Sequence, residues 1–225
     1  MPPKVRRHPG KRRIPVPFPW DPDLPANQSS IQTNYNALSV KVVDAGLAGD
    51  RPTDEAVRAW HKQSVRGVRL AEPAIAGGYR GEGPPTGQLA TYLNGVNNVP
   101  GAPAAEVGVF VARFFAELDA RLDDLDARRA AGATLTDLYA DVVRTAAWVH
   151  GQWVRIHPFA DHNGSTARLL TINVGLLYGV HFKLPGKPRT DMPSHGLVLD
   201  YNLAAASQMQ GNDQNMVLVL DRLAR

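Results

Sequence analysis

Apolar side chains recur at intervals of three and four residues over most of this 225-residue chain, which is the period of an amphipathic helix. The pattern first appears after Ser30, where one helical face carries Ile31, Tyr35, Leu38 and Val42. It predicts a helix that ends at Gly46 and Gly49. A second helix is expected after residues 52–55, because Pro-Thr-Asp-Glu places acids in a first turn.

Two longer apolar stripes occupy the middle of the chain. The first consists of Val107, Val111, Phe114, Leu118, Leu122 and Leu125. The second follows a start resembling a capping box at 134–137 and consists of Leu135, Leu138, Val142, Ala146, Val149, Trp153 and Ile156. A further helix is expected to end near Gly179, and two shorter ones at about 197–210 and 213–224. Because strand patterns are nearly absent, the sequence predicts an all-α fold.

Residues 72–104 interrupt this pattern with seven glycines and five prolines. Such a composition excludes a helix. An irregular segment of this length inside a globular domain is usually functional or mobile. An ordinary surface loop is the alternative.

The first 26 residues form a separate, basic segment. They hold eight prolines, which exclude a helix or central strand, and six Lys or Arg residues without an acid among positions 1–13. The net charge of the whole chain is only +4, so the rest of the chain is close to neutral. We therefore expect a Pro-rich arm over 1–26 and a single helical domain over 27–225. Nucleic acid is an expected partner only through this arm.

Composition excludes several classes of protein. The chain has no cysteine, which excludes disulfides, thiolate metal sites and a cysteine nucleophile. No apolar run approaches the roughly 20 residues of a membrane span, and the basic N-terminus lacks the apolar core of a secretory signal. The expected location is the cytoplasm, with no membrane partner.

The strongest chemical signal is the stretch I-H-P-F-A-D-H-N-G-S-T-A-R at 156–168, between two predicted helices. Pro158 disfavours helix at His157, so the incoming helix is expected to end just before it. Asn163 is a good N-cap, and Gly164 allows a ligand close to the backbone. The outgoing helix is therefore expected to start at one of these two residues.

The side chains of this stretch suit phosphate chemistry. A helix N-terminus offers N–H donors and a partial positive charge, and Arg168, one turn inside, can reach back with its guanidinium. Asp161 can hold Mg²⁺, which takes carboxylate and phosphate oxygens. His157 has a pKa suited to a general base. Together these groups predict transfer of a phosphate-containing group to a hydroxyl.

A zinc site is the alternative use of the histidines near this stretch. Its ligands would be His150, His157, Asp161 and His162. The first two are seven residues apart across a helix end, which does not match the i, i+4 pair of H-E-x-x-H. We therefore prefer phosphate chemistry.

The stretch resembles the signature of the Fic family, H-P-F-x-(D/E)-G-N-G-R-x-x-R. The matching residues are His157, Pro158, Phe159, Asp161, Asn163, Gly164 and Arg168. Two positions depart, since His162 replaces a glycine and Ser165 replaces the first arginine. The resemblance covers about residues 70–222. It implies an all-α, Fic-type helical bundle with a short β-hairpin flap before the second core helix.

The resemblance also implies an activity, the transfer of AMP from Mg-ATP to a Ser, Thr or Tyr hydroxyl of a target protein. Mg²⁺ would be the cofactor and ATP the donor substrate. His157 would be the general base and Asp161 the metal ligand. The donor's phosphates would be bound by Asn163, Gly164, Ser165, Arg168 and His162.

The two departures leave alternatives open. Ser165 supplies a hydroxyl but no charge, which implies weak activity, a different donor or a lost catalytic function. The corresponding alternatives are a Doc-like kinase or a Fic enzyme with another phosphate-containing donor, and a degenerate scaffold that binds a protein. His162 could contact a phosphate or narrow the anion pocket.

The resemblance finally implies partners. The expected flap strand, which would hold the target's backbone, is Gln88, Leu89, Ala90, Thr91 and Tyr92. Inhibited Fic proteins carry (S/T)-x-x-x-E-(G/N), and no glutamate of this chain has Ser or Thr four residues before it. Any inhibition is therefore expected from a separate, antitoxin-like protein.

Overall fold

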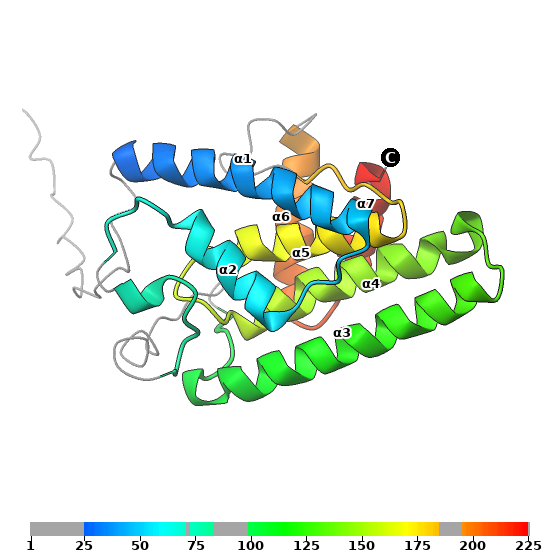
Figure 1. Cartoon of the computed structure of the whole chain (residues 1–225), viewed down its shortest axis with the longest axis horizontal. Coiled ribbons are helices and arrows are strands. Elements are labelled where there is room, and N and C mark those ends of the chain that lie inside the picture. Colours follow the sequence, from blue (N-terminus) through cyan, green and yellow to red (C-terminus); the bar gives the residue numbers. More distant parts are fainter. Residues whose placement is uncertain (1–24, 71–72, 83–98, 185–194, 225) are drawn as a thin grey trace, which may run out of the picture.

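The structure, a computed structural model, describes residues 25–70, 73–82, 99–184 and 195–224. This part of the chain holds seven α-helices: α1 (Pro25–Ala48), α2 (Asp54–Ser64), α3 (Val107–Ala130), α4 (Leu135–Ile156), α5 (Asn163–Leu177), α6 (His195–Met209) and α7 (Gln214–Leu223) (Figure 1). One 3₁₀ turn, η1 (Pro73–Ile75), lies in the segment 72–104 predicted to lack helices, and a second, η4 (Ala104–Glu106), begins at its last residue. The described residues include no strand, which confirms the all-α prediction; one isolated bridge joins Phe182 to Ala224.

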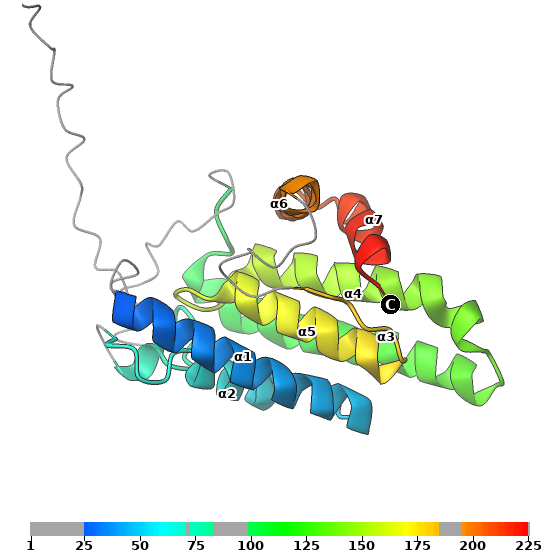
Figure 2. The same ribbon diagram turned by 90° about the horizontal axis from the view of Figure 1, so that it is seen from above.

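The helix α5 lies at the centre of the bundle. Figure 2 shows it between α1 and α4, with α2 beyond on the side of α1 and with α6 and α7 on the opposite side of the molecule. All but two of its residues are buried, as expected of a core helix, and the buried side chains include polar ones such as Arg168 and Asn173. The N-terminus of α5 follows the C-terminus of α4 after a loop of six residues, 157–162. The bundle therefore holds both ends of the 157–162 loop.

The predicted signals at α2 and α4 are confirmed. The hydroxyl of Thr53 accepts a hydrogen bond from the Ala56 N–H and caps α2. At α4, Thr134 and Asp137 form a complete capping box. The same helix ends at Ile156, as the proline two residues later requires. These signals depend on neighbours in the sequence, which is why the sequence alone located them.

The bounds of α1 correct two predictions. The helix begins at Pro25, five residues before Ser30 and inside the arm predicted to extend to residue 26. Proline is well tolerated at a first helical position, because the missing N–H is not needed there. The helix also passes Gly46 and ends at Ala48, so of the two glycines predicted to end it only Gly49, with a φ of 87°, does so. A Cβ at Gly46 would lie 2.8 Å from the Leu176 Cβ, so this glycine allows α1 to approach α5.

Some predictions fall outside the described residues. These are the flap strand at 88–92 and the basic arm up to residue 24. No helix among the described residues has the length and apolar character needed to cross a membrane.

Candidate active site

His157 occupies the C-cap of α4 in an unusual backbone conformation. Its φ is 52° and its ψ is 54°, the left-handed region that glycine normally fills at a helix end. Its N–H still bonds to the Trp153 carbonyl at 2.9 Å. A non-glycine residue in this region costs on the order of 1 kcal/mol, and such strain concentrates at functional sites.

The imidazole of His157 is held by one nitrogen. Its Nδ1 lies 3.0 Å from the Val154 carbonyl oxygen. A carbonyl can only accept, so Nδ1 carries the proton and the neutral ring presents Nε2 as a proton acceptor. Burial lowers the pKa of His157, and the charge of Arg80 lowers it further, while Val154 and the Asp161 carboxylate act in the opposite direction. The ring is therefore neutral at neutral pH, as a general base must be.

The loop after His157 is closed by a side chain that the sequence assigned to a different task. Asn163 was expected to cap α5, but His162 is the N-cap and Asn163 is the first helical residue. The buried amide of Asn163 accepts from the Phe159 N–H at 2.9 Å and donates to the Phe159 carbonyl at 2.8 Å. Phe159 is itself fully buried between the rings of His61 and Tyr79. This pairing fixes the loop between the two helices.

The first turn of α5 leaves donors available. The first backbone bond of the helix runs from Thr166 to His162, and the N-cap side chain makes no bond to the turn. The N–H groups of Asn163, Gly164 and Ser165 therefore precede the intrahelical ladder. Free N–H groups and the helix dipole make such a turn suitable for an anion.

Arg168 adds a buried cation to this turn. It is only 1% exposed, and its Nη2 donates to the Ser165 hydroxyl at 3.1 Å. Its Nε and Nη1 are buried without a hydrogen-bond partner. A Cβ on Gly164 would lie 3.7 Å from that Nη1, which places the unpaired donor at the start of α5. A buried guanidinium with unsatisfied donors fits an anionic ligand.

His162 directs its ring toward α2. It has a φ of 60°, so it occupies a backbone conformation that glycine adopts easily. Its Nδ1 lies 3.0 Å from the Ser64 hydroxyl, which itself donates to the His61 carbonyl. The hydroxyl has only one proton, so His162 is the donor. This bond ties the loop to a helix 98 residues away in the sequence.

Comparison with known proteins identifies the arrangement. A sequence model of the Fic/DOC family matches residues 52–174, more than half of the chain. The chain belongs to the Fic/DOC family. Among solved structures, a Fic-domain-containing signalling protein from Bacteroides thetaiotaomicron VPI-5482 is similar, with a TM-score of 0.56 and 16% identity. The similarity covers 88% of this chain and 67% of that one, and at this identity it shows the shared fold alone. None of the curated proteins matches the chain.

The Fic signature residues occupy one loop and the first two turns of one helix. His157, Asp161 and His162 lie in the loop, and Asn163, Gly164, Ser165 and Arg168 lie in the first two turns of α5. The structure thus brings every described candidate of the sequence analysis to the junction of α4 and α5. Sequence reasoning did not find the bond between Ser165 and Arg168, although their i, i+3 spacing puts them on the same helix face.

Asp161 is suited to a metal ion that binds together with the phosphates of a substrate. One of its carboxylate oxygens accepts from the His162 N–H at 2.6 Å. The described residues contain no group of three or more His, Cys, Asp or Glu side chains that could hold a metal ion. Mg²⁺ is commonly held by one or two carboxylates together with substrate phosphates. A single carboxylate in the loop at 157–162, called the Fic loop below, is consistent with that mode.

The zinc alternative receives no support from the described residues. His150 uses both ring nitrogens inside the core, with Nδ1 2.6 Å from the Gln208 amide oxygen and Nε2 2.7 Å from the Tyr201 hydroxyl. It lies on α4, about two helical turns before the Fic loop. Its role is to satisfy buried polar groups between α4 and α6.

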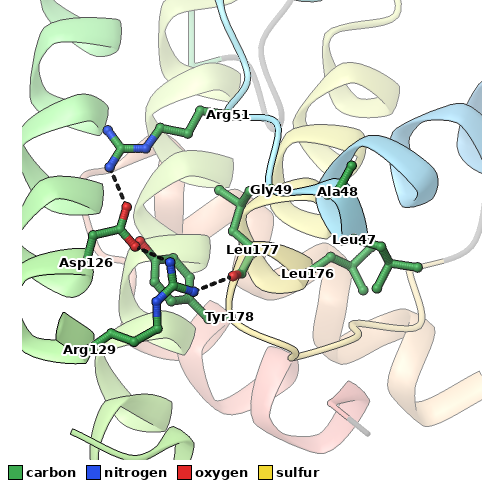
Figure 3. Close-up of a pocket in the computed structure, with 10 residues that line it drawn as sticks. Leu47, Ala48, Gly49, Arg51, Asp126, Arg129, Leu176, Leu177 and Tyr178 are labelled. Atoms are coloured by element: carbon green, nitrogen blue, oxygen red, sulfur yellow. Dashed lines mark hydrogen bonds and ion pairs between the residues drawn. The ribbon is translucent and has the colours of Figure 1, made fainter. Parts of the chain in front are cut away.

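A pocket of about 220 Å³ lies at the other end of α5 (Figure 3). Its charged side chains bind one another: Asp126 pairs with Arg51 at 2.6 Å and with Arg129 at 2.7 Å. Arg129 also donates to the Leu177 carbonyl. These contacts join the C-terminal ends of α1, α3 and α5. In contrast to Arg168, the two arginines have carboxylate partners, so the pocket contributes to the packing of the bundle.

The burial of His61 beside the Fic loop predicts that the stability of the protein depends on pH. This residue of α2 is fully buried, stacks on Phe159 with ring centroids 3.8 Å apart, and accepts the Gly77 N–H through Nδ1. Burial, together with a smaller effect of the nearby His162, lowers the pKa of His61 to about 3. Between pH 6.5 and about pH 3, His61 is therefore protonated in the unfolded chain but neutral in the folded protein. We expect stability to fall below pH 6.5, by about 1.4 kcal/mol per pH unit, or about 2 kcal/mol by pH 5.

The measurement is urea unfolding of the wild type and His61→Phe at pH 7 and pH 5. Phenylalanine keeps the stacked ring but cannot titrate. The variant is expected to lose about 2 kcal/mol less than the wild type between the two pH values. An equal loss in both proteins would show that His61 does not carry the effect.

Proposed function

We propose that this Fic protein transfers AMP from Mg-ATP to a hydroxyl group of a target protein. The observation that carries the proposal is the tautomer of His157. Its Nδ1 proton is committed to the Val154 carbonyl, so Nε2 is the nitrogen able to take a proton. The buried, partly unpaired guanidinium of Arg168 supports a phosphate-containing donor for the same reaction.

The proposed reaction is an in-line displacement at phosphorus. The target's hydroxyl oxygen attacks the α-phosphorus of the donor, and its proton passes to Nε2 of His157. The bond between that phosphorus and the leaving oxygen breaks, and pyrophosphate departs. The first N–H groups of α5 and the Nε and Nη1 groups of Arg168 would donate to the donor's phosphates. Mg²⁺ held by Asp161 would neutralise part of their charge.

Ser165 supports a second candidate, a Fic enzyme with another donor or a Doc-like kinase. Its hydroxyl binds Arg168 Nη2, so the position that carries the first arginine of the Fic signature here holds an acceptor. One guanidinium remains to stabilise the transferred group. The loss of a charged contact to a developing charge costs several kcal/mol of transition-state stabilisation, which favours slow transfer or a donor bound differently.

The experiment is the intact mass of the protein after incubation with Mg²⁺ and each of ATP, GTP, CTP and UTP. Fic enzymes often modify themselves, so no target is required. We expect a gain of one AMP unit with ATP. A gain from another nucleotide, or a gain of one phosphate, would instead establish the second candidate and name its donor.

The matched control is the same incubation with Asp161→Asn, which keeps the size of the side chain but lowers its charge. Transfer that needs Mg²⁺ at this residue should fall in the variant. If no donor modifies the wild type or a supplied panel of cellular proteins, the proposed transferase activity is wrong, and the degenerate scaffold that binds a protein becomes the conclusion.

A further inference from the structure

Arg80 is a buried cation bound to the end of α4. Its side chain is 4% exposed and donates to three carbonyl groups: Nε to His157 at 2.6 Å, and Nη2 to Ile156 at 3.0 Å and to Ala102 at 2.7 Å. Its backbone N–H donates to the Pro158 carbonyl at 2.7 Å. All of these partners are carbonyl oxygens, and burial lowers the pKa of Arg80.

The contacts of Arg80 take the place of the hydrogen bonds that usually satisfy the last carbonyl groups of a helix. The last carbonyls of a helix lack intrahelical partners and carry a partial negative charge. A glycine in the left-handed conformation commonly satisfies them through the following N–H groups. In this chain the left-handed residue is His157, whose side chain carries the proposed chemistry. A guanidinium, with five donors in a planar fork, satisfies the carbonyls from outside the helix.

The backbone at Gly101 makes a second close contact with His157. A Cβ on Gly101 would lie 2.5 Å from the His157 Cβ and 3.2 Å from Arg80 Nη2. The next residue, Ala102, donates its N–H to the Arg155 and Ile156 carbonyls. The backbone at 101–102 therefore lies directly against the histidine. His157 is enclosed between this backbone and the α4 helix, with Arg80 bound to both.

We infer that Arg80 and the backbone at Gly101 position His157. Together they fix the peptide groups on both sides of its Cα, and this keeps Nδ1–H on the Val154 carbonyl and Nε2 available as the acceptor. Arg80 itself contacts no reacting atom. Its predicted effect on rate rests on the proposed function, whereas its effect on the imidazole tautomer does not.

The test uses three variants of the full chain. Arg80→Lys keeps the charge but cannot span three carbonyls, and Gly101→Ala places a methyl group against His157. Arg58→Lys is the matched control. Arg58 lies 3.6 Å from the Tyr79 ring and binds Glu82, so it supports the same loop without touching the end of α4.

The first readout is the ¹⁵N NMR spectrum of the His157 imidazole at pH 8. We expect the Nδ1–H tautomer in the wild type and in Arg58→Lys, and a shift toward the Nε2–H tautomer in the other two variants. A purely structural role would lower stability and leave the tautomer unchanged. If either variant fails to fold by circular dichroism, the remaining one decides the test. An unchanged tautomer in every folded variant would overturn the inference.

The second readout is the kinetics of transfer with the donor identified by mass. Misplacement of a base by about 1 Å can cost about a hundredfold in rate. We expect kcat to fall by about ten- to a hundredfold in Arg80→Lys and Gly101→Ala, with the donor KM unchanged within about twofold. An inactive wild type would contradict the proposed function, but the tautomer measurement would still decide the role of Arg80. Unchanged kcat in an active protein would contradict that role.

Discussion

Replacing His157 with alanine is expected to lower the rate of transfer by about 10²- to 10⁴-fold, the range that a positioned general base contributes. The reason is the fixed tautomer, since Nδ1–H binds the Val154 carbonyl and Nε2 is left to accept the proton of the attacking hydroxyl. The measurement is the single-turnover rate of the mass gain. Affinity for the nucleotide should change little, because the phosphate donors lie on α5.

The matched control for this prediction is His181→Ala. This histidine is exposed and follows the C-terminal end of α5, whereas the Fic loop precedes the N-terminal end of that helix. Its rate should equal that of the wild type. A His157→Ala variant that transfers as fast as the wild type would remove this residue from the mechanism, even if the protein proved to be a transferase.

Replacing Arg168 with methionine is expected to separate binding from stability. The guanidinium is 1% exposed, has Ser165 as its hydrogen-bonded partner, and lies 5.6 Å from the centroid of the Tyr35 ring. Burial by itself would lower the pKa of Arg168, but Tyr35 and Tyr201 together raise it by more. The pKa is therefore raised overall, and the guanidinium stays charged. Methionine, which is of similar length, removes a buried charge whose hydrogen bond goes to a hydroxyl and not to a carboxylate. Such replacements are often neutral or stabilising for the fold.

The same change should weaken nucleotide binding by about thirty- to a hundredfold, or about 2–3 kcal/mol, because charged hydrogen bonds to phosphate are lost. The measurements are calorimetric titration with Mg²⁺ and a non-hydrolysable ATP analogue, and urea unfolding without nucleotide. Arg129→Met is the control, since that arginine belongs to the pocket at the far end of α5. A variant that unfolds more easily and binds nucleotide normally would make Arg168 a structural residue.

Sequence reasoning succeeded where a signal is complete within a few residues. The Thr134–Asp137 capping box, the proline that ends α4 and the helical period of the apolar positions all depend on near neighbours. The order of the Fic signature residues likewise placed His157 at a helix end and Arg168 inside the next helix. These features set the all-α fold and the position of the candidate site.

Sequence reasoning failed where the partner is remote or where one residue suits two tasks. The bond between His162 and Ser64 joins residues 98 positions apart, and the contact of Arg80 with His157 spans 77 positions. Neither separation leaves a periodic signal. Asn163 is as suitable for closing a loop as for capping a helix. Gly46 could end a helix or allow another helix to approach, and only the position of Leu176 decides between them.

The contacts of Arg80 have a consequence for how the fold tolerates changes in chain length. The chain leaves the end of α4 at Gly81 and returns to it at Ala102, and a Cβ on Gly81 would lie only 2.1 Å from the Ala104 carbonyl oxygen. The intervening residues thus form an insert whose two ends meet. The free energy of closing such an insert rises only slowly with its length. A change in the number of residues between Gly81 and Ala102 is therefore expected to cost little free energy of folding, because both ends stay anchored beside His157.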